Sequence, residues 1–354
     1  MNTMLHYDVY PSPVAIHSRR EAHGRVGSGV LHASRMDDAL TLDAYLDEWL
    51  ALQRTRIEPT TWTNYQLMAR YYLRPGLGEC PVAELTVRAL DRHYVQLLEH
   101  GGRRGQGLSR RTIAYAHGIL HKALADGVAA GLLGDNVAAR ATVPRVDPRR
   151  DATPRQVRTW DREQVRRFLQ QSADHELGDL WRVALGTGMR RGELLGLRWE
   201  DVDLTVPSLQ VATTLTHVHG DFRLKQTKTR RVRRLHLDDD TAEVLARQPR
   251  RAGGPYPLVF TRDDGQPLVP EVVTDRWRCQ WPALDLPRIR LHDLRHTHAT
   301  LLLAAGVPIK VVSERLGHTT IALTMDIYAH VLPAMDRDAA AAYGRLLDEP
   351  DEAR

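Results

Sequence analysis

The hydrophobic positions recur with a helical period from about residue 40 onward. In the stretch 40–53 the apolar side chains fall at i, i+3, i+4, i+7 and i+8, on one helix face: Leu42, Tyr45, Leu46, Trp49 and Leu50. Comparable patterns predict helices over 60–73, 86–99 and 109–126. Their N-cap candidates, all hydroxyl residues, are Thr60, Thr86 and Ser109. We therefore expect a helical domain over residues 39–143.

The segments on either side of this helical unit lack an apolar period. Residues 1–38 carry scattered proline, glycine, serine and arginine, which favours an irregular N-terminal arm. Residues 144–158 hold three prolines and five arginines. Because proline keeps such a segment extended and out of a helix, we expect a basic interdomain linker there.

The pattern changes after the linker, where short alternating segments separate the helices. Helical periods occur at 161–171, 174–187, 269–280, 292–304, 308–316 and 320–329. Alternation predicts a small antiparallel sheet from strands at 208–218, 222–226 and 231–237, and a short apolar strand at 257–261. We expect a second domain over 159–332 and an alanine-rich helix, 333–347, in a C-terminal tail over 333–354. The predicted fold class is mainly α with a small antiparallel β-sheet.

Length and composition narrow the class of protein. A chain of 354 residues can bury two separate cores. A net charge of +5 and a pI near 9.3 make a polyanion a plausible partner. The two cysteines, Cys80 and Cys279, cannot build a disulfide framework. No stretch approaches the roughly 20 apolar residues of a membrane span, and the N-terminus lacks the apolar core of a secretion signal. We therefore expect a cytoplasmic protein without membrane contact.

A glycine turn at 186–188 leads into a short helix that carries Arg190 and Glu193. Residues three apart lie on the same side of a helix, so the carboxylate can hold the guanidinium. An arginine aimed in this way has the fork geometry that suits a phosphate. An ordinary surface ion pair is the alternative, and it would contribute little to stability.

Seven basic residues and no acidic residue occur from Arg223 to Arg234. We expect this run on a hairpin made by the strands 222–226 and 231–237, with Lys228 at the turn. Charge runs usually form a solvated face, but one this dense on a short hairpin indicates contact with a polyanion. Lys225 is the alternative to Lys228 as the lysine that reaches into a site.

The segment 291–330 carries the densest set of chemical groups. His292 and Arg295 are three residues apart on one predicted helix, so both project from the same side. His318 follows the next predicted helix, and Tyr328 lies ten residues further on. His292 and His296 are four residues apart, but the zinc motif on such a helix has a glutamate after the first histidine, where Asp293 stands here. Arg295 would also place a positive charge beside a cation, so we predict no metal ligand here.

Five segments in this order resemble the motifs of the tyrosine recombinase family, in particular the phage-type integrases. They are TGMRRGELLGLRW, QTKTRRVRRLHL, LHDLRHTHATLLLAAG, LGH and TMDIYAH, between about residues 159 and 335. The order of the five, with 23 residues from Arg295 to His318 and ten more to Tyr328, makes the resemblance specific. The helical unit at 40–142 is similar to the core-binding domain of that family. The resemblance implies a site-specific DNA recombinase that integrates or excises a mobile element through a 3′-phosphotyrosine intermediate.

The resemblance also implies roles for the residues of the site. Arg190 and Arg295 would clamp the scissile phosphate, and Glu193 would support Arg190. His292 and His318 would hydrogen-bond the phosphate or shuttle protons. Lys228 would donate a proton to the leaving 5′-oxygen, and Tyr328 would be the nucleophile.

These roles agree with general chemistry. Fixed guanidinium groups stabilise the negative charge of a phosphodiester transition state without reorganising. A phenol with a pKa of about 10 needs nearby cations or a base to attack at neutral pH. Because a tyrosyl phosphodiester conserves the bond energy for religation, we expect neither a cofactor nor a metal. Tyr343, in an alanine-rich helix typical of packing, and Tyr256, in a loop, are the alternatives to Tyr328.

The implied partner is double-stranded DNA with a recombination site, held in a C-shaped clamp of the two domains. Candidate DNA contacts are Thr61, Arg110, Arg111, Lys122, Arg230 and Arg231. The family analogy has the C-terminal helix dock on a neighbouring subunit of a homotetramer. An excision factor or a host DNA-bending protein would be an additional partner. Three other functions remain open at this point: a chromosome-dimer-resolving recombinase, a non-catalytic DNA-binding regulator with the same fold, and a metal-dependent nuclease.

Overall fold

The computed structural model describes residues 40–102, 105–144, 158–226 and 232–318, together with residues 320 and 325. The chain divides into two compact units, one up to Arg155 and one from Gln156 onward, and each has its own hydrophobic core. The division falls within the segment 144–158, for which the sequence predicts a linker. Among the described helices, none has the length and apolar character needed to cross a bilayer.

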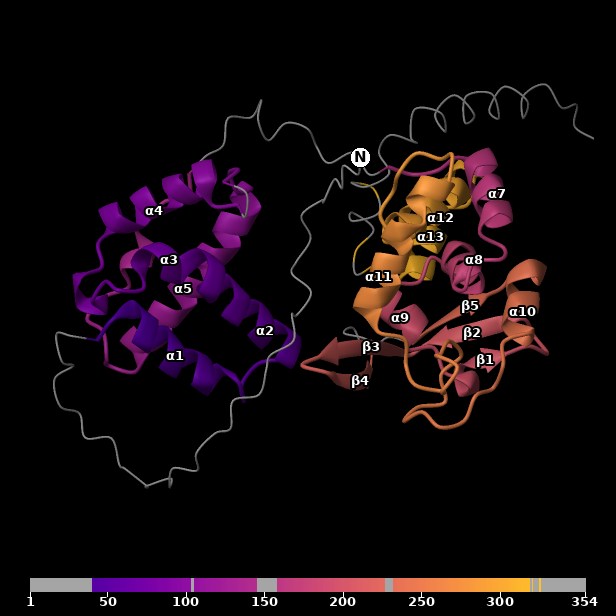
Figure 1. The fold of residues 1–354 in the computed structure, drawn as a ribbon, viewed down its shortest axis with the longest axis horizontal. Coiled ribbons are helices and arrows are strands. Elements are labelled where there is room, and N and C mark those ends of the chain that lie inside the picture. The colour runs from indigo at the N-terminus through magenta and orange to yellow at the C-terminus, as the bar shows by residue number, and fades with distance from the viewer. Residues whose placement is uncertain are drawn as a thin grey trace, which may run out of the picture. The chain divides into compact units, whose positions relative to one another are not determined.

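The first unit is helical (Figure 1). Its helices are α1 (Leu42–Gln53), α2 (Pro59–Met68), a π-helical turn (Ala69–Leu73), α3 (Arg74–Leu77), α4 (Val87–His100) and α5 (Arg110–Ala129), with short 3₁₀ turns at Val82–Glu84 and Val137–Ala139. Thr86 and Ser109 cap α4 and α5 as predicted, each through its side-chain oxygen. Thr60 is not a cap, because α2 begins one residue earlier, at Pro59, a residue suited to the first helical position.

The core of the first unit confirms the helix face predicted from residues 40–53. All five apolar side chains of that face are buried. Two of them also bind α5 through their polar ends: the Tyr45 hydroxyl donates to the Ala123 carbonyl at 2.5 Å, and Trp49 Nε1 donates to Asp126 at 2.8 Å. Aromatic residues with a polar tip thus fix α1 against α5 as well as filling the core.

The second unit combines helices with two small antiparallel sheets, one of which projects from the unit as a hairpin (Figure 1). Its helices are α7 (Arg162–Gln171), α8 (Gly178–Thr187), α9 (Arg191–Leu195), α10 (Asp239–Ala246), α11 (Pro270–Cys279), α12 (Asp293–Ala304) and α13 (Ile309–Leu316), with 3₁₀ turns at Trp199–Asp201 and Trp281–Ala283. One sheet has the order β1 (Val202–Asp203), β2 (Ser208–Val211), β5 (Arg233–His236). The other pairs β3 (Thr213–Val218) with β4 (Asp221–Gln226). The predicted fold class, mainly α with antiparallel sheet, is confirmed.

The strand pairing differs from the prediction. The hairpin is formed by β3 and β4 and turns at His219–Gly220, whereas β5 pairs with β2, Leu209 opposite Leu235. The segments 222–226 and 233–236 therefore lie in different sheets, so these two strands do not form the predicted hairpin. The predicted strand 208–218 is split, because the chain leaves the first sheet after Val211 and enters the second at Thr213.

Two further elements differ from the prediction. Residues 257–261 form no strand; Leu258 and Thr261 make only isolated bridges, to Arg198 and Pro267. The helix α10 was not predicted, although Asp238 caps it by accepting from the Thr241 main-chain N–H at 3.0 Å. Only three of its residues, Thr241, Val244 and Leu245, are buried, so its apolar period is weak.

A cluster of aromatic rings holds the helices of the second unit together. The Trp277 ring lies 5.2–6.0 Å from the rings of Trp160, Phe168, Trp181 and Trp281, centroid to centroid. Trp160 also donates from Nε1 to the Pro287 carbonyl at 2.9 Å. Rings from α7, α8 and α11 thus interlock in the core of the second unit.

Candidate active site

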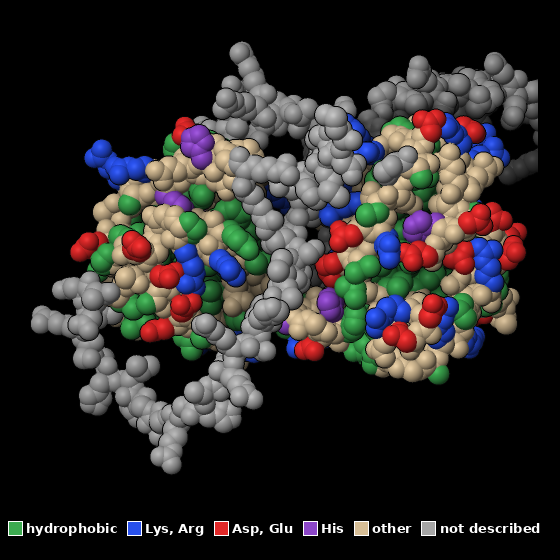
Figure 2. All heavy atoms as spheres, in the orientation of Figure 1, with side chains coloured by type: hydrophobic (Ala, Val, Ile, Leu, Met, Phe, Trp, Pro, Cys, Tyr) green, Lys and Arg blue, Asp and Glu red, His purple; other side chains and the backbone are tan. Residues whose placement is uncertain are grey.

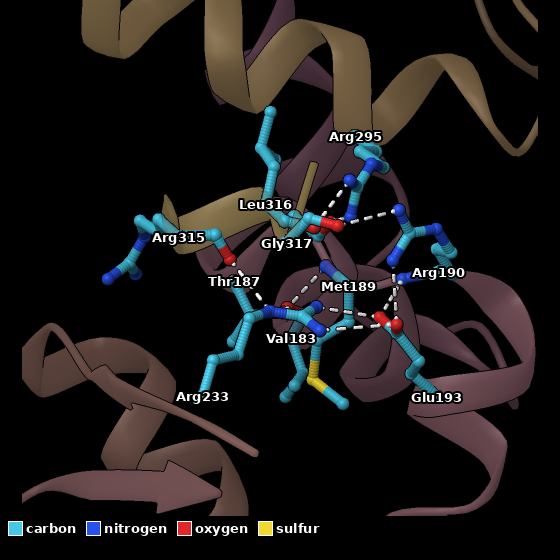
Figure 3. A network of polar contacts seen from close by, with 11 residues as sticks. Val183, Thr187, Met189, Arg190, Glu193, Arg233, Arg295, Arg315, Leu316 and Gly317 are labelled. Carbon is cyan, nitrogen blue, oxygen red and sulfur yellow. Dashed lines mark hydrogen bonds and ion pairs between the residues drawn. The ribbon is translucent and has the colours of Figure 1, made fainter. Parts of the chain in front are cut away.

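The C-terminal end of α13 is where three arginine side chains meet (Figure 3). The last carbonyls of a helix have no partner within it, and Gly317 ends α13 in the left-handed conformation, with φ 65°. Three guanidiniums supply the missing donors at consecutive residues: Arg233 Nε to Arg315 O at 2.9 Å, Arg295 Nη2 to Leu316 O at 2.5 Å and Arg190 Nη2 to Gly317 O at 3.1 Å. Cations at a helix C-terminus also complement its dipole.

Arg190 reaches this point because α8 ends in a sharp turn. Gly188 adopts the left-handed conformation with φ 64°, and the chain then enters α9, for which Arg190 is the N-cap residue. Glu193, three residues on, accepts from the Arg190 main-chain N–H at 2.9 Å and from Nη1 at 2.8 Å. The predicted side-by-side arrangement of these two residues is present, and 43% of the Arg190 side chain remains exposed.

Arg295 comes from the first turn of α12 and is only 3% exposed. Its Nη1 donates to the Gly188 carbonyl at 2.8 Å, while its Nη2 donates to Leu316. One buried guanidinium therefore joins the end of α8 to the end of α13. Arg190 and Arg295 bind the adjacent carbonyls of Gly317 and Leu316, so the two predicted phosphate-binding arginines converge from two sides.

Glu193 is a buried carboxylate shared by two arginines. Arg233 donates to it from Nη1 at 3.2 Å and from Nη2 at 2.7 Å, opposite the two donors of Arg190. Burial alone would raise the pKa of Glu193, but the hydrogen bonds and charge of Arg233, with those of Arg190, lower that pKa to about 2. The carboxylate is therefore ionised at neutral pH and carries four hydrogen bonds.

The two predicted site histidines lie within the field of these arginines. His318 directly follows Gly317; partial burial and then the charges of Arg295 and Arg190 lower its pKa to about 4. His292, the residue before α12, has a lowered pKa from desolvation and from the charge of Arg295. Both imidazoles are thus neutral at pH 7, a form that can accept a proton or a hydrogen bond.

Two more histidines pack behind the site. The His296 ring lies 5.0 Å from the His292 ring, edge to face, and burial lowers the pKa of His296 to about 4. His298 bonds through Nδ1 to the Leu185 carbonyl at 2.7 Å, and its Nε2 accepts from Arg315 Nε at 3.0 Å. These partners require the proton on Nδ1, and burial holds the pKa of His298 at about 3.

The structure brings together four of the six predicted site residues: Arg190, His292, Arg295 and His318. Lys228 and Tyr328 lie outside the described residues, as do Arg230, Arg231, the N-terminal arm and the C-terminal helix. The prediction of a helix over 320–329 also falls almost wholly outside them. Among the described residues, no three histidine, cysteine or acidic side chains are grouped as metal ligands would be.

The candidate DNA contacts of the first unit differ in their surroundings. Arg110 and Arg111 are exposed in the first turn of α5. Thr61 is partly buried in α2. Lys122 is engaged within the unit, because its Nζ lies 3.1 Å from Asp126. The exposed pair on α5 is therefore better placed to contact a ligand than Lys122.

Sequence reasoning missed Arg233, which it counted as one of the seven basic residues of a surface run. In β5, Arg233 and Leu235 share a face, and Arg233 stands opposite the buried Val211. Its side chain is 12% exposed, whereas that of the next residue, Arg234, is 51% exposed. The alternation of a strand around the apolar Leu235 is the signal that could have placed Arg233 inside.

Away from the end of α13, the described charges on the visible face of the second unit are mixed in sign. On that face, acidic and basic side chains lie next to one another (Figure 2). Near α10, Arg182 pairs with Asp240 and Arg247 pairs with Asp179. The end of α13 differs from these pairs, because three arginines bond to its carbonyls and only two of them share a carboxylate, that of Glu193.

Comparisons with known proteins identify the family. Residues 158–335 match the model of the phage integrase family, and residues 41–98 match that of the phage integrase N-terminal SAM-like domain. The chain belongs to the phage integrase family. It is accordingly a tyrosine-type site-specific DNA recombinase, which confirms the class of enzyme predicted from the motifs.

Relatives of this class match along most of the chain. A protein described as "Tyrosine recombinase XerC-like" from Caldanaerobacter subterraneus is 27% identical over 334 residues, which cover 87% of this chain and 83% of the relative. The ICEBs1 integrase of Bacillus subtilis is 23% identical, with 89% and 85% covered.

Solved structures show the same fold. The Tn1549 transposon integrase in complex with a circular intermediate DNA matches with a TM-score of 0.65 at 20% identity, over 82% of this chain and 99% of that chain. A lambda integrase tetramer bound to a Holliday junction matches with a TM-score of 0.61 at 18% identity, over 80% of this chain and 79% of that chain.

Proposed function

We propose that this recombinase integrates or excises a mobile element by cutting and rejoining double-stranded DNA at a recombination site, with Tyr328 as the nucleophile. The observation that carries the proposal is the convergence of Arg190 and Arg295 on the carbonyls of Gly317 and Leu316, directly before His318. This places two guanidiniums and an imidazole around one end of a helix, an arrangement suited to a phosphodiester.

The two arginines would act on the charge of the scissile phosphate. Each is anchored by main-chain carbonyls, and Arg190 is also anchored by Glu193, so neither needs to reorganise when charge develops on the phosphate oxygens. Such fixed donors typically contribute about 10²–10³ in rate each. The exposed part of the Arg190 side chain is the face that DNA would approach.

The chemical step transfers a phosphoryl group from one oxygen to another. The Tyr328 oxygen attacks the phosphorus, the bond to the 5′-oxygen breaks, and a 3′-phosphotyrosine forms. Lys228 gives a proton to the leaving 5′-oxygen, while a neutral imidazole, of His292 or His318, takes the phenol proton or hydrogen-bonds the phosphate. A 5′-hydroxyl of the partner duplex then reverses the step, and no external energy source is needed.

The proposal extends to the assembly on DNA. The relatives of similar fold include an integrase with a circular DNA intermediate and an integrase tetramer on a Holliday junction, which supports double-stranded DNA as the partner and a homotetramer as the working form. In this chain the helix at 333–347 would link subunits, and Arg110, Arg111, Arg230 and Arg231 would contact phosphates. Thr61 and Lys122 are further candidates. An excision factor or a host DNA-bending protein would set the direction of the reaction.

A trapping experiment tests the proposal. Nicked duplexes, tiled across the DNA that flanks the gene, lose a short fragment on cleavage and trap the covalent complex. Wild-type protein should form a protein–DNA adduct in the presence of a chelator, and Tyr328→Phe should bind the same duplex without forming it. Binding without any wild-type adduct would indicate a DNA-binding regulator, and loss of cleavage with chelator would indicate a metal-dependent nuclease.

Chromosome-dimer resolution is a second candidate function, favoured by the similarity to the XerC-like relative. It uses the same chemistry, so the active site does not separate the two functions. The recombination products separate them. A plasmid assay can compare the frequency of deletion between two direct repeats of one site with the frequency of insertion into a different site. Insertion supports the mobile-element function, and deletion between identical sites alone supports resolution.

A further inference from the structure

Arg233 is built into the interior of the second unit rather than into a basic surface. Its side chain is 12% exposed, and each of its three guanidinium nitrogens donates a hydrogen bond. Nη1 and Nη2 donate to the two oxygens of Glu193, and Nε donates to the Arg315 carbonyl. The rigid fork of arginine allows this simultaneous contact in two directions, which a lysine could not make.

These contacts connect three chain segments that carry the site. Arg233 belongs to β5, and Lys228 lies five residues before it in the sequence. Glu193 belongs to α9 and holds Arg190. Arg315 belongs to the last turn of α13, three residues before His318. A single buried guanidinium therefore joins the supports of Arg190 and His318 (Figure 3).

The burial of Glu193 makes this connection necessary. Its side chain is only 5% exposed, and a buried carboxylate is costly unless cations and hydrogen bonds compensate it. Arg190 donates two of the four hydrogen bonds to Glu193, but its side chain is half-exposed and also bonds to the Gly317 carbonyl. Without Arg233, the carboxylate would lose its two remaining hydrogen bonds and its more buried cation.

We propose that Arg233 is a positioning residue of the cleavage reaction, which fixes the Glu193 carboxylate and the C-terminal end of α13 so that Arg190 and His318 face the same phosphate. The inference rests on the proposed function, in which Arg190 contacts the scissile phosphate. Arg233 itself, being buried, acts through these two groups rather than on DNA.

The adjacent residue, Arg234, provides a matched control. It lies on the other face of the same strand, is half-exposed and donates to the Ser208 hydroxyl at 2.9 Å. Arg233→Met and Arg234→Met remove the same charge and nearly the same volume, so general effects on DNA attraction should be equal. Only the first variant disturbs Glu193 and α13.

In single-turnover cleavage of a nicked duplex, Arg233→Met should form the covalent adduct about 10²-fold more slowly than Arg234→Met, the scale of loss for a misplaced group. The Kd of the two variants for the same duplex should agree within about twofold, because their total charge is equal. Arg233→Lys, which keeps the charge but not the fork, should fall between wild type and Arg233→Met. Equal cleavage rates for the two methionine variants would overturn the proposal.

The pH profile separates positioning from a general loss of structure. In wild type, Glu193 is ionised throughout the working range, because its pKa is about 2. Without Arg233, burial should raise the pKa of Glu193. The rate of cleavage by Arg233→Met should therefore fall further as the pH becomes acidic. The double variant Arg233→Met/Glu193→Gln should lack this acid-side fall. A loss by the same factor at every pH would count against the proposal.

A measurement without DNA keeps the inference separate from the proposed function. Rotation of the Arg190 guanidinium can be followed by NMR of its terminal nitrogens, and it should be slow in wild type and in Arg234→Met. In Arg233→Met it should be faster, because Glu193 no longer holds a fixed position. Unchanged rotation would overturn the inference even if cleavage by Tyr328 were established, and faster rotation would support it even if Tyr328 proved not to be the nucleophile.

Discussion

Arg295 donates from Nη2 to the main-chain carbonyl of Leu316 at 2.5 Å, and this bond ties the first turn of α12 to the last turn of α13. The same guanidinium holds the Gly188 carbonyl, at the end of α8. A cation that is 3% exposed thus serves as the junction of three helices, α8, α12 and α13. In the proposed mechanism it is also a phosphate ligand, so substitution of Arg295 removes a structural junction and a catalytic group together.

Arg190 offers a cleaner separation, because its side chain is 43% exposed. Arg190→Ala should lower the rate of adduct formation by about 10²–10³, the effect of losing one fixed donor to the transition state. Its urea-unfolding midpoint should change much less than that of Arg295→Ala, which leaves two buried carbonyls without their donor. Wild-type cleavage by Arg190→Ala would show that this arginine does not contact the phosphate.

Gly188 should tolerate no side chain. Its φ of 64° is unfavourable for other residues, and an added Cβ would lie 2.7 Å from His298 Cδ2 and 2.9 Å from Leu316 Cδ2. Gly188→Ala should therefore destabilise the protein more than Gly306→Ala, which has φ 79° and nothing within 4 Å of the new Cβ. The control should lose about 1–2 kcal/mol in urea unfolding and the test variant clearly more. Equal losses of unfolding free energy in the two variants would mean that the side chains around α13 move readily to accommodate the added methyl group.

His298 should make the stability of the protein sensitive to acid. Its pKa is about 3 in the folded protein against about 6.5 when unfolded, so below pH 6.5 the unfolded chain takes up a proton that the folded chain does not. The contribution of His298 to the free energy of unfolding is therefore fully present above pH 6.5. It is lost as the pH falls below that value, by up to about 1.4 kcal/mol per pH unit. In urea unfolding, His298→Gln should show a shallower decline between pH 6 and about 4.5 than wild type. The exposed His236→Gln should behave like wild type, and a parallel decline in both variants would contradict the assignment.

His318 should respond to an anion at the site. In the free protein its pKa is about 4, held down by burial and by Arg295 and Arg190. A bound phosphodiester would offset the two positive charges, so the pKa of His318 should rise when DNA binds. NMR titration of the imidazole, with and without a duplex in complex with Tyr328→Phe, measures both values. An imidazole that titrates near 6.5 in the free protein, or does not respond to DNA, would place His318 away from the phosphate.

DNA affinity should depend on salt through exposed arginines of the first unit. Each phosphate contact contributes a slope of about −0.9 to log K against log salt concentration. Arg110→Ala/Arg111→Ala should reduce both the affinity and the steepness of that dependence. Lys122→Ala should have a smaller effect, since its amine is already paired with Asp126. A nearly flat salt dependence of the wild-type protein would contradict phosphate contacts as the main source of affinity.

Local patterns in the sequence predicted those parts of the fold that depend on local geometry. The three-residue spacing of Arg190 and Glu193 acts within one turn, because Arg190 is the N-cap residue of α9 and Glu193 bonds to it; the caps at Thr86 and Ser109 are local in the same way. Strand pairing is not local. The segment 222–226 joins the strand before it, while 233–236 joins a strand more than twenty residues earlier, and nothing in either segment specifies that choice.

The candidate site shows the same difference between local patterns and tertiary contacts. Motif and spacing predicted Arg190, Arg295 and His318 as site residues. The feature that brings them together, the bonding of arginines to carbonyls of α13, follows from tertiary packing alone. Arg233 was not recognised as a buried residue, because it belongs to a run of basic residues whose charge density indicated an exposed surface. The buried Leu235, two residues on, was the better guide to its direction.

Identification of the residue that is covalently joined to DNA tests the proposed mechanism most directly. Wild-type protein trapped on a nicked duplex is digested with nuclease and protease, and the peptide that retains a nucleotide is sequenced by mass spectrometry. If Tyr328 is the nucleophile, a single modified peptide should carry the nucleotide 3′-phosphate on Tyr328. Attachment at Tyr343 or Tyr256, or an adduct of undiminished yield in Tyr328→Phe, would contradict it.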